Sequence, residues 1–304
     1  MKPVLKKVLL ALVSVVGLAA VGLGGYVYLQ VSAFNKSVAK VYDIPVPQVQ
    51  ASTEATVIER GAHLARSVAG CAIADCHGSD LAGGKAISLG PVGTIGAPNI
   101  TSAGMGAVYS DGELMRLIEH GVKRDGTTAL FMVSHEINWL PQDDILAIVA
   151  YMRSVQPVNK VGATPEAGLL GKVLDRRNQF AWDIARRINH NDLDKAPPPS
   201  PTAEYGRHIA KSCMGCHGET FGGGPIPGAP PDMPVPMNIT PDESGLAGWT
   251  YEEFERFSDH GIRKDGKQVD PFMPLEMLRN MDQTERKALF SFLTSLPKKP
   301  FGSR

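Results

Sequence analysis

Cys213-Met214-Gly215-Cys216-His217 is the stretch on which the interpretation of this chain depends. A Cys-x-x-Cys-His run attaches a c-type haem: the two thiols add to the two vinyl groups of one porphyrin, and the histidine that follows coordinates the iron. A zinc half-site would need two more ligands at comparable spacing, and a disulfide would leave His217 without a role. The stretch therefore predicts one covalently bound haem.

The composition describes a folded protein without a preference for nucleic acid. The 304 residues are enough for two domains of ordinary size. Lys plus Arg and Asp plus Glu both number 31, so no overall charge would draw the chain to DNA or RNA. The cysteines form two pairs, each followed by His, and none is left for a structural disulfide: Cys71, Cys76, Cys213 and Cys216.

An apolar, uncharged run from Val8 to Leu29 is long enough as a helix to cross a bilayer. A cleaved signal peptide is the competing interpretation, because the chain starts with the basic residues Lys2, Lys6 and Lys7. The run is longer than a usual signal core, which favours an uncleaved anchor. We expect residues 1–30 to be a cytoplasmic N-terminus and a single transmembrane anchor, and residues 31–50 to be a spacer.

The chain repeats itself after about 140 residues. A shift of 140 places Cys76-His77 on Cys216-His217, and shifts of 139 and 141 match Asn99-Ile100-Thr101 with Asn238-Ile239-Thr240 and Phe131-Met132 with Phe272-Met273. The matched blocks keep their order, which indicates a duplication. We expect one domain in residues 51–157 and a second in residues 202–304. Residues 158–201 are expected to be a linker with a helical segment, 169–188, and a stiff proline-rich stretch.

Both copies are expected to be all-α. Short helices should lead into the cysteine motifs, at residues 54–67 and 203–211. Capping boxes at residues 110–113 and 250–253 should open helices that end at Gly121 and Gly261. A last helix is expected in each copy, Gln142 to Ser154 and Gln283 to Ser295. No stretch alternates with period two for long enough to predict a sheet.

The first cysteine motif is irregular, because four residues separate Cys71 from Cys76-His77. On a helix these sulfurs would point about 140° apart, so both reach one porphyrin only if the loop between them bulges. The alternative is that this copy has lost haem and that its cysteines form a disulfide. Since His77 and Met132 match His217 and Met273, we expect a second covalent haem at Cys71 and Cys76.

Each iron needs a distal ligand if it only carries electrons, and a methionine thioether is a usual choice. Met273 lies in a loop between two prolines, and Met132 lies at the matched position of the first copy. The expected axial pairs are therefore His77 with Met132 and His217 with Met273. Two alternatives stay open: His135 in place of Met132, and Met277 in place of Met273.

The chain resembles the class I cytochrome c domains of the cytochrome subunits of bacterial membrane-bound alcohol, aldehyde and gluconate dehydrogenases. The resemblance covers about residues 54–157 and 202–298. It rests on Ala97-Pro98-Asn99-Ile100-Thr101, Asn238-Ile239-Thr240-Pro241-Asp242, Gly248-Trp249, the Gly-x-x-x-Asp-Gly segments and the Phe-Met loops. It implies small helical haem domains in which the Asn-Ile-Thr segment and Trp249, or Tyr109 in the first copy, lie beside the haem. Those subunits typically carry three haem motifs, whereas this chain has two.

The function expected from these features is that of a membrane-anchored dihaem cytochrome c, an electron carrier without catalytic residues. It would serve a periplasmic respiratory chain or accept electrons as a dehydrogenase subunit, held in the bacterial inner membrane with its haem domains in the periplasm. Its partners would be the membrane and redox proteins: a dehydrogenase, a quinol-oxidising complex or a terminal oxidase. The alternatives are a dihaem peroxidase-like enzyme and a haem-based gas sensor, both of which need an open iron site.

Overall fold

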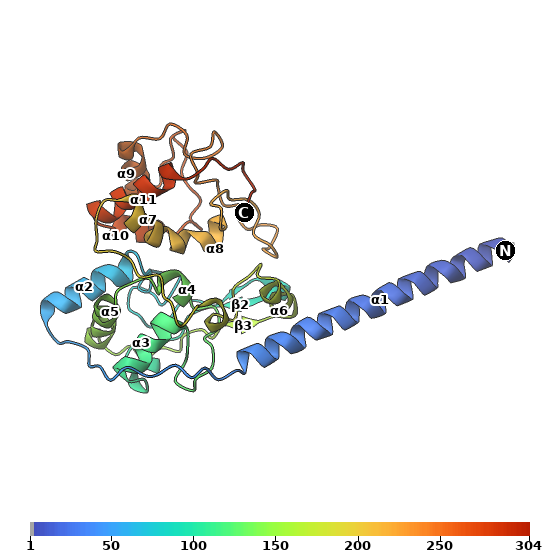
Figure 1. Cartoon of the computed structure of the whole chain (residues 1–304), viewed down its shortest axis with the longest axis horizontal. Coiled ribbons are helices and arrows are strands. Elements are labelled where there is room, and N and C mark those ends of the chain that lie inside the picture. The colour runs from blue at the N-terminus through green and yellow to red at the C-terminus, as the bar shows by residue number, and fades with distance from the viewer. Residues whose placement is uncertain (1–2) are drawn as a thin grey trace.

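Two helical lobes and one projecting helix make up the molecule (Figure 1). The computed structural model describes residues 3–304, so Lys2 of the basic start lies outside the described residues. The lobe of the first repeat contains α2 (Ala55–Arg66), η2 (Met105–Ala107), α3 (Asp111–His120), α4 (Ser134–Ile137) and α5 (Gln142–Ser154). The lobe of the second repeat contains α7 (Ala203–Ile209), η4 (Ala210–Cys213), α8 (Met214–His217), α9 (Tyr251–His260), α10 (Leu275–Asn280) and α11 (Gln283–Ser295).

The predicted helix ends are confirmed. Ser110 and Thr250 accept hydrogen bonds from the backbone N–H groups three residues on, and the glutamates there bond back, so both capping boxes are complete. Their helices end at Gly121 and Gly261, with φ values of 63° and 69° in the left-handed region that favours glycine. The last helices, α5 and α11, have the predicted bounds. The helix predicted at 203–211 instead divides into α7 and the tighter η4.

The same helix crossing occurs in both lobes, where α2 packs on α5 and α7 packs on α11. At each crossing one glycine touches the backbone of the partner helix. A Cβ on Gly61 would lie 1.9 Å from the Ala147 carbonyl oxygen, and a Cβ on Gly206 would lie 1.9 Å from that of Ala288. Only glycine allows this approach.

A strained backbone position also recurs. Leu81 has a φ of 58°, and its counterpart Phe221 has a φ of 61°. Each residue accepts a backbone hydrogen bond from the isoleucine of the Asn-Ile-Thr segment, Ile100 or Ile239. The two matched positions therefore share a backbone conformation that residues other than glycine rarely adopt.

A small antiparallel sheet, which the sequence does not predict, lies in the first lobe. Its strands are β1 (Ile87–Ser88), β2 (Gly93–Ile95) and β3 (Glu166–Ala167), in the order β1-β2-β3, with η1 (Gly90–Val92) between the first two. Ile87 pairs with Ile95, and Gly93 pairs with Ala167. Strands of two or three residues are too short to leave a period-two pattern in the sequence.

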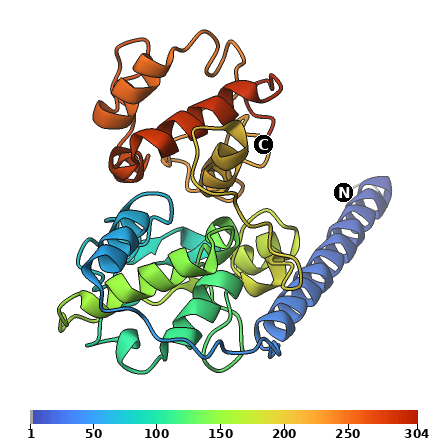
Figure 2. The ribbon, with the colours of Figure 1, turned by 60° about the vertical axis from the view of Figure 1, so that its left-hand side comes forward.

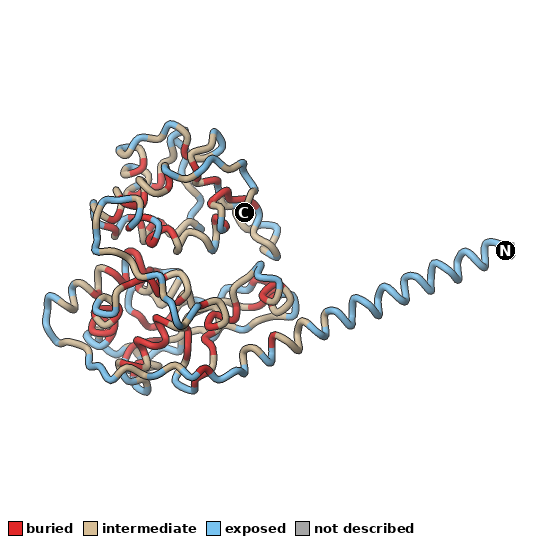
Figure 3. The backbone as a smooth tube through the Cα atoms, viewed as in Figure 1, coloured by how far each residue is buried: buried red, intermediate tan, exposed pale blue. Residues whose placement is uncertain are grey.

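The projecting helix is α1 (Pro3–Val38), which continues nine residues beyond the expected end of the anchor at Leu29. It is the one helix in residues 3–304 that is long and apolar enough to cross a membrane, and a signal sequence would pass the same test. Its first part stands clear of the lobes and is exposed (Figure 3). Its last turns pack on α6 (Leu169–Arg176) and bury Phe34.

The expected spacer and linker both fold onto the first lobe. After α1 the chain runs along α3, where Arg116 donates to the Ile44 carbonyl oxygen and the Ala51 N–H donates to Asp111. In the linker, the helix expected over residues 169–188 ends at Arg176, and a turn leads to η3 (Ala185–Arg187). Trp182 lies in that turn with no exposed surface, so burial rather than helical periodicity decides its conformation.

The two lobes lie one above the other and share one apolar core (Figures 1 and 2). At the interface Trp139 of the first lobe packs edge-on against Tyr205, with 6.0 Å between ring centroids, and Trp139 is fully buried. The Ser212 hydroxyl also donates to the Val68 carbonyl oxygen across the interface, at 3.3 Å. The second of these contacts joins the residues just before the two cysteine motifs, since Val68 precedes Cys71 and Ser212 precedes Cys213.

Candidate haem sites

One cavity in the first lobe collects the residues that the sequence singled out there. Its volume is about 330 Å³, which lies within the range of small-molecule sites, and its lining is mostly apolar. Cys71, Cys76, His77 and Met132 all line it. Residues separated by up to 61 positions are thus brought to one space.

The irregular motif reaches this cavity because it is not helical. Residues 71–77 fold as successive turns: the Cys76 N–H donates to the Ile73 carbonyl oxygen, and the His77 N–H donates to that of Cys71 at 3.1 Å. The Ala74 N–H in the middle of the loop donates to Glu276 of the second lobe, at 3.1 Å. The loop between the two cysteines therefore bulges, and both cysteines line the cavity.

The two motif histidines are held in the same way. The Nδ1–H of His77 donates to the Pro98 carbonyl oxygen at 2.8 Å, and the Nδ1–H of His217 donates to that of Met237 at 2.7 Å. Burial lowers the pKa of both rings, so they are neutral. A neutral imidazole that is bonded through Nδ1 has Nε2 available as a ligand, which is the arrangement found in metal-binding histidines.

The four thiols are free. Burial raises the pKa of Cys71 and of Cys213 to about 12, and that of Cys76 to about 11. Zinc would need deprotonated sulfurs and four converging ligands. Within residues 3–304 the one cluster of metal-ligating side chains is His63, Asp282 and Glu285, which contains none of the cysteines. The sites therefore fit neutral thioethers better than a zinc centre.

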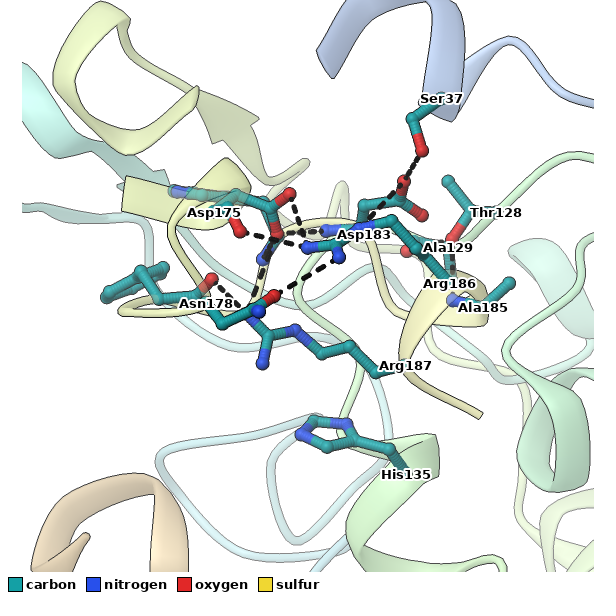
Figure 4. A network of polar contacts seen from close by, with 12 residues as sticks. Ser37, Thr128, Ala129, His135, Asp175, Asn178, Asp183, Ala185, Arg186 and Arg187 are labelled. Atoms are coloured by element: carbon teal, nitrogen blue, oxygen red, sulfur yellow. Dashed lines mark hydrogen bonds and ion pairs between the residues drawn. The ribbon is translucent and has the colours of Figure 1, made fainter. Parts of the chain in front are cut away.

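His135 does not line the cavity that Met132 lines. Its ring lies beside Arg187 (Figure 4), and burial together with that guanidinium lowers the pKa of His135 to about 4. Met277 packs against the first lobe: a Cβ on Gly70 would be 2.9 Å from Met277 Sδ. Both alternative ligands named from the sequence thus have other surroundings.

In the second lobe the matched residues lie on the shared core. His217 is buried, and Cys213 and Met273 are half-buried against the core cluster. Cys216 is also half-buried. Trp249 packs edge-on against Phe257, with 5.9 Å between ring centroids.

The Asn-Ile-Thr segments hold the chain that follows each last helix. The Asn99 amide donates to the carbonyl oxygens of Val158 and Lys160, both at 2.8 Å, and the Asn238 amide donates to that of Lys299 at 2.7 Å. Ile100 lines the cavity, whereas Asn99 and Tyr109 do not. Within the Asn-Ile-Thr segment of the first lobe, Ile100 is thus the residue that lines the cavity.

Sequence reasoning missed the residue that lies between the two motifs, Glu136. A Cβ on Gly215 would be 3.0 Å from Glu136 Oε1, and burial raises the pKa of this carboxyl group to about 8. No sequence signal marks it, because its position depends on how the lobes pack. The carbonyl groups of Pro98 and Met237 were also missed, although both directly precede an Asn-Ile-Thr segment.

The family match among the comparisons with known proteins falls in the second lobe. Residues 203–297 match the family model for cytochrome c, so this part of the chain is a cytochrome c domain, a type that carries covalent haem c. A stretch of 99 residues, 30% of the chain, is 34% identical to one of the subunits of nicotinate dehydrogenase from Pseudomonas putida, of which it covers 8%.

Two other relatives are cytochrome subunits of dehydrogenases. The cytochrome c subunit of alcohol dehydrogenase (quinone) from Gluconacetobacter polyoxogenes is 32% identical over 100 residues, and the fructose dehydrogenase cytochrome subunit from Gluconobacter japonicus is 31% identical over 101 residues. Each match takes in 31% of this chain and 21% of the relative, so the chain spans about a fifth of their length. These similarities support electron transfer by a c-type cytochrome.

Proposed function

We propose that this chain is a membrane-anchored cytochrome with two covalently bound haems, which passes single electrons between redox partners at the periplasmic face of a bacterial inner membrane. The observation that carries the proposal is the first-lobe cavity, which is lined by both thiols of an irregular motif, its histidine and a methionine 55 residues later. An unused cysteine pair would have no reason to share a cavity with that methionine.

In the first lobe, Cys71 and Cys76 would hold the porphyrin through thioethers, with His77 and Met132 as axial ligands. The bound haem supplies the one-electron couple of its iron. The Pro98 carbonyl group keeps the proton of His77 on Nδ1 and so fixes the ring orientation. The mostly apolar lining suits the apolar faces of a porphyrin.

In the second lobe we assign the same roles to Cys213 and Cys216, and to His217 and Met273 as the axial pair. The cytochrome c match over residues 203–297 and the bond from His217 to the Met237 carbonyl oxygen support this assignment. The recurring helix crossings and the recurring left-handed residues support two tandem domains, in residues 51–157 and 202–304.

A relay inside the molecule needs the two sites to be close, and the contacts between the lobes favour this. Ala74, which lies between the first pair of thiols, bonds to Glu276 of the second lobe. Glu136, which follows Met132 by four residues, lies against Gly215 inside the second motif. Each motif thus contacts the opposite lobe.

The membrane anchor and the partners are part of the same proposal. The apolar length of α1 supports a single span with the lobes on the far side, where c-type haem is attached. Because the relatives are named as cytochrome subunits of dehydrogenases, we propose a dehydrogenase as the electron donor. A quinol-oxidising complex or a terminal oxidase would be the other redox partner.

Mass spectrometry and carbon monoxide binding test the proposal. We expect the intact mass to include two haems, and the Cys71→Ser, Cys76→Ser double variant to lose one of them. The reduced spectrum should be low-spin and unchanged by carbon monoxide. A mass of one haem with a Cys71–Cys76 disulfide would refute the first site, and a haem that binds carbon monoxide would favour the peroxidase or the sensor.

A further inference from the structure

The loop that carries Met132 is held by a part of the chain that has no counterpart in the second repeat. The Phe131 N–H donates to the Trp182 carbonyl oxygen at 3.1 Å, and the Ile184 N–H donates to that of Ala129 at 3.4 Å. Leu130 and Asp183 thereby pair as an isolated antiparallel bridge. The segment between the repeats is therefore bonded along the length of this loop.

Phe131, which directly precedes Met132, has a φ of 53°. A bulky residue in the left-handed region is strained and persists only where surrounding contacts fix it. Two rings supply such contacts: Phe180 stacks on Phe131 with 5.7 Å between centroids, and Trp182 lies 5.5 Å away. Since Phe131 and Met132 both line the cavity, the backbone angles of Phe131 set the direction in which Met132 enters it.

The same segment is tied to the end of α1. The Ser37 hydroxyl donates to Asp183 Oδ2 at 2.5 Å (Figure 4), and Phe34 lies in one apolar cluster with Trp182. The Ala185 N–H donates to the Thr128 hydroxyl on the other side. Membrane helix, connector and Met132 loop thus form one continuous set of contacts.

The second repeat provides a natural contrast. Asp270 and Pro271 stand where the first repeat has Leu130. Asp270 bonds within its own loop: its carboxylate accepts from the Phe272 N–H at 2.9 Å and its carbonyl oxygen from the Met273 N–H at 3.0 Å. Phe272 is 42% exposed and, among the described residues, belongs to no aromatic pair and is not one of the positive-φ positions. The left-handed turn at Leu81 recurs at Phe221, but the one at Phe131 does not recur.

We propose that Phe131 and Trp182 are positioning residues that hold Met132 in place as the distal ligand of the first site, whereas the Met273 loop has no such support from the connector and is bonded through Asp270. The proposal rests on the proposed function, because it takes Met132 as that ligand. It gives the connector a role in setting the properties of one haem only.

Carbon monoxide binding to the reduced, full-length protein in detergent tests this. We expect Phe131→Ala and Trp182→Leu to bind carbon monoxide at the first site at concentrations that leave the wild-type spectrum unchanged. The affinity of this site should rise at least about tenfold, which corresponds to about 1.4 kcal/mol. The matched variant Phe272→Ala should not change that site, and Phe131→Tyr, which keeps the ring, should behave as wild type. Spectra of the Met132→Ala variant with carbon monoxide show which absorbance change belongs to the first site.

Two results would overturn the inference. Only the second of them would also overturn the assignment of Met132 as the distal ligand. If Met132→Ala opens the site but Phe131→Ala and Trp182→Leu do not, the positioning role is wrong and the ligand assignment stands. If Met132→Ala leaves the spectrum unchanged, both fail. Trp182 is fully buried, so Trp182→Leu could fail to fold. In that case the variants of the half-buried Phe131, Phe131→Ala and Phe131→Tyr, decide whether the positioning role holds.

Discussion

His63 of the first lobe and Glu285 of the second lobe form an ion pair across the interface, with 2.9 Å between Nε2 and Oε1. Glu285 is only 1% exposed, and it also completes the capping box of α11 with Asp282. The helix that leads into the first motif is thus bonded to the start of the last helix of the chain. The two repeats behave as one unit at this point.

This pair predicts a pH dependence of stability. The hydrogen bond to Glu285 raises the pKa of His63 above its ordinary value of 6.5, against the opposing effects of burial and of Arg60. A raised pKa means that the pair stabilises the fold fully below pH 6.5 and loses this effect as the pH rises through the folded-state pKa of His63. We expect His63→Gln to cost about 1 kcal/mol at acid pH and less at alkaline pH, measured by denaturant unfolding.

If His63→Gln lowers the free energy of unfolding by the same amount at every pH, the charge on His63 does not contribute to stability. His260→Gln is the matched control, since His260 ends α9 without an ion pair among those found in the described residues. It should leave the pH profile unchanged.

The glycines at the helix crossings should not tolerate a methyl group. Gly61→Ala and Gly206→Ala would each place a Cβ 1.9 Å from a carbonyl oxygen, so the helices must move apart. We expect a loss of about 3 kcal/mol or more for each, seen as a lower midpoint of thermal unfolding. Gly22→Ala in α1 has open space around its Cβ and should be neutral; equal effects at all three positions would contradict the argument.

Met273 and Met277 should respond differently to truncation. Met273→Ala should open the second iron to carbon monoxide and lower its potential, because the thioether raises the potential of haem c. Met277→Ala should leave that haem closed, since Met277 Sδ packs against Gly70 of the other lobe. Carbon monoxide titration and redox titration measure both. If Met277→Ala opens the second iron and Met273→Ala does not, Met277 is the distal ligand and Met273 is not.

Removal of α1 up to residue 30 should yield a soluble, red protein if a cleavable secretion signal precedes the cut. The cut must spare Phe34 and Ser37, because they contact the first lobe. The full-length protein should stay with membranes in high salt and enter solution in detergent, as followed by haem absorbance in the fractions. Full-length protein found in the soluble fraction with its N-terminus trimmed near Ala20 would mean that α1 is a signal peptide.

Local patterns in the sequence were sufficient for most helices. The capping boxes at Ser110 and Thr250 and the last helices were predicted with their observed ends, because caps and glycine stops act within one turn of the chain. The cysteine spacing likewise indicated haem attachment in the second repeat, where residues 203–297 match the cytochrome c family. The assignment of Met132 and Met273 as ligands stays a prediction.

What the sequence by itself determined about this protein is therefore its local chemistry: a mostly helical chain, two motif histidines that each follow a pair of thiols, and one long apolar helix. Only the tertiary structure decided which distant groups meet. The contact between Trp182 and Phe131 could not be predicted from the sequence. Trp182 lies in a connector of 44 residues, 158–201, and no periodic pattern there indicates which loop the connector packs against. Glu136 reached Gly215, and Glu276 reached Ala74, through the packing of one lobe on the other, which depends on the shape of whole surfaces and not on any short pattern.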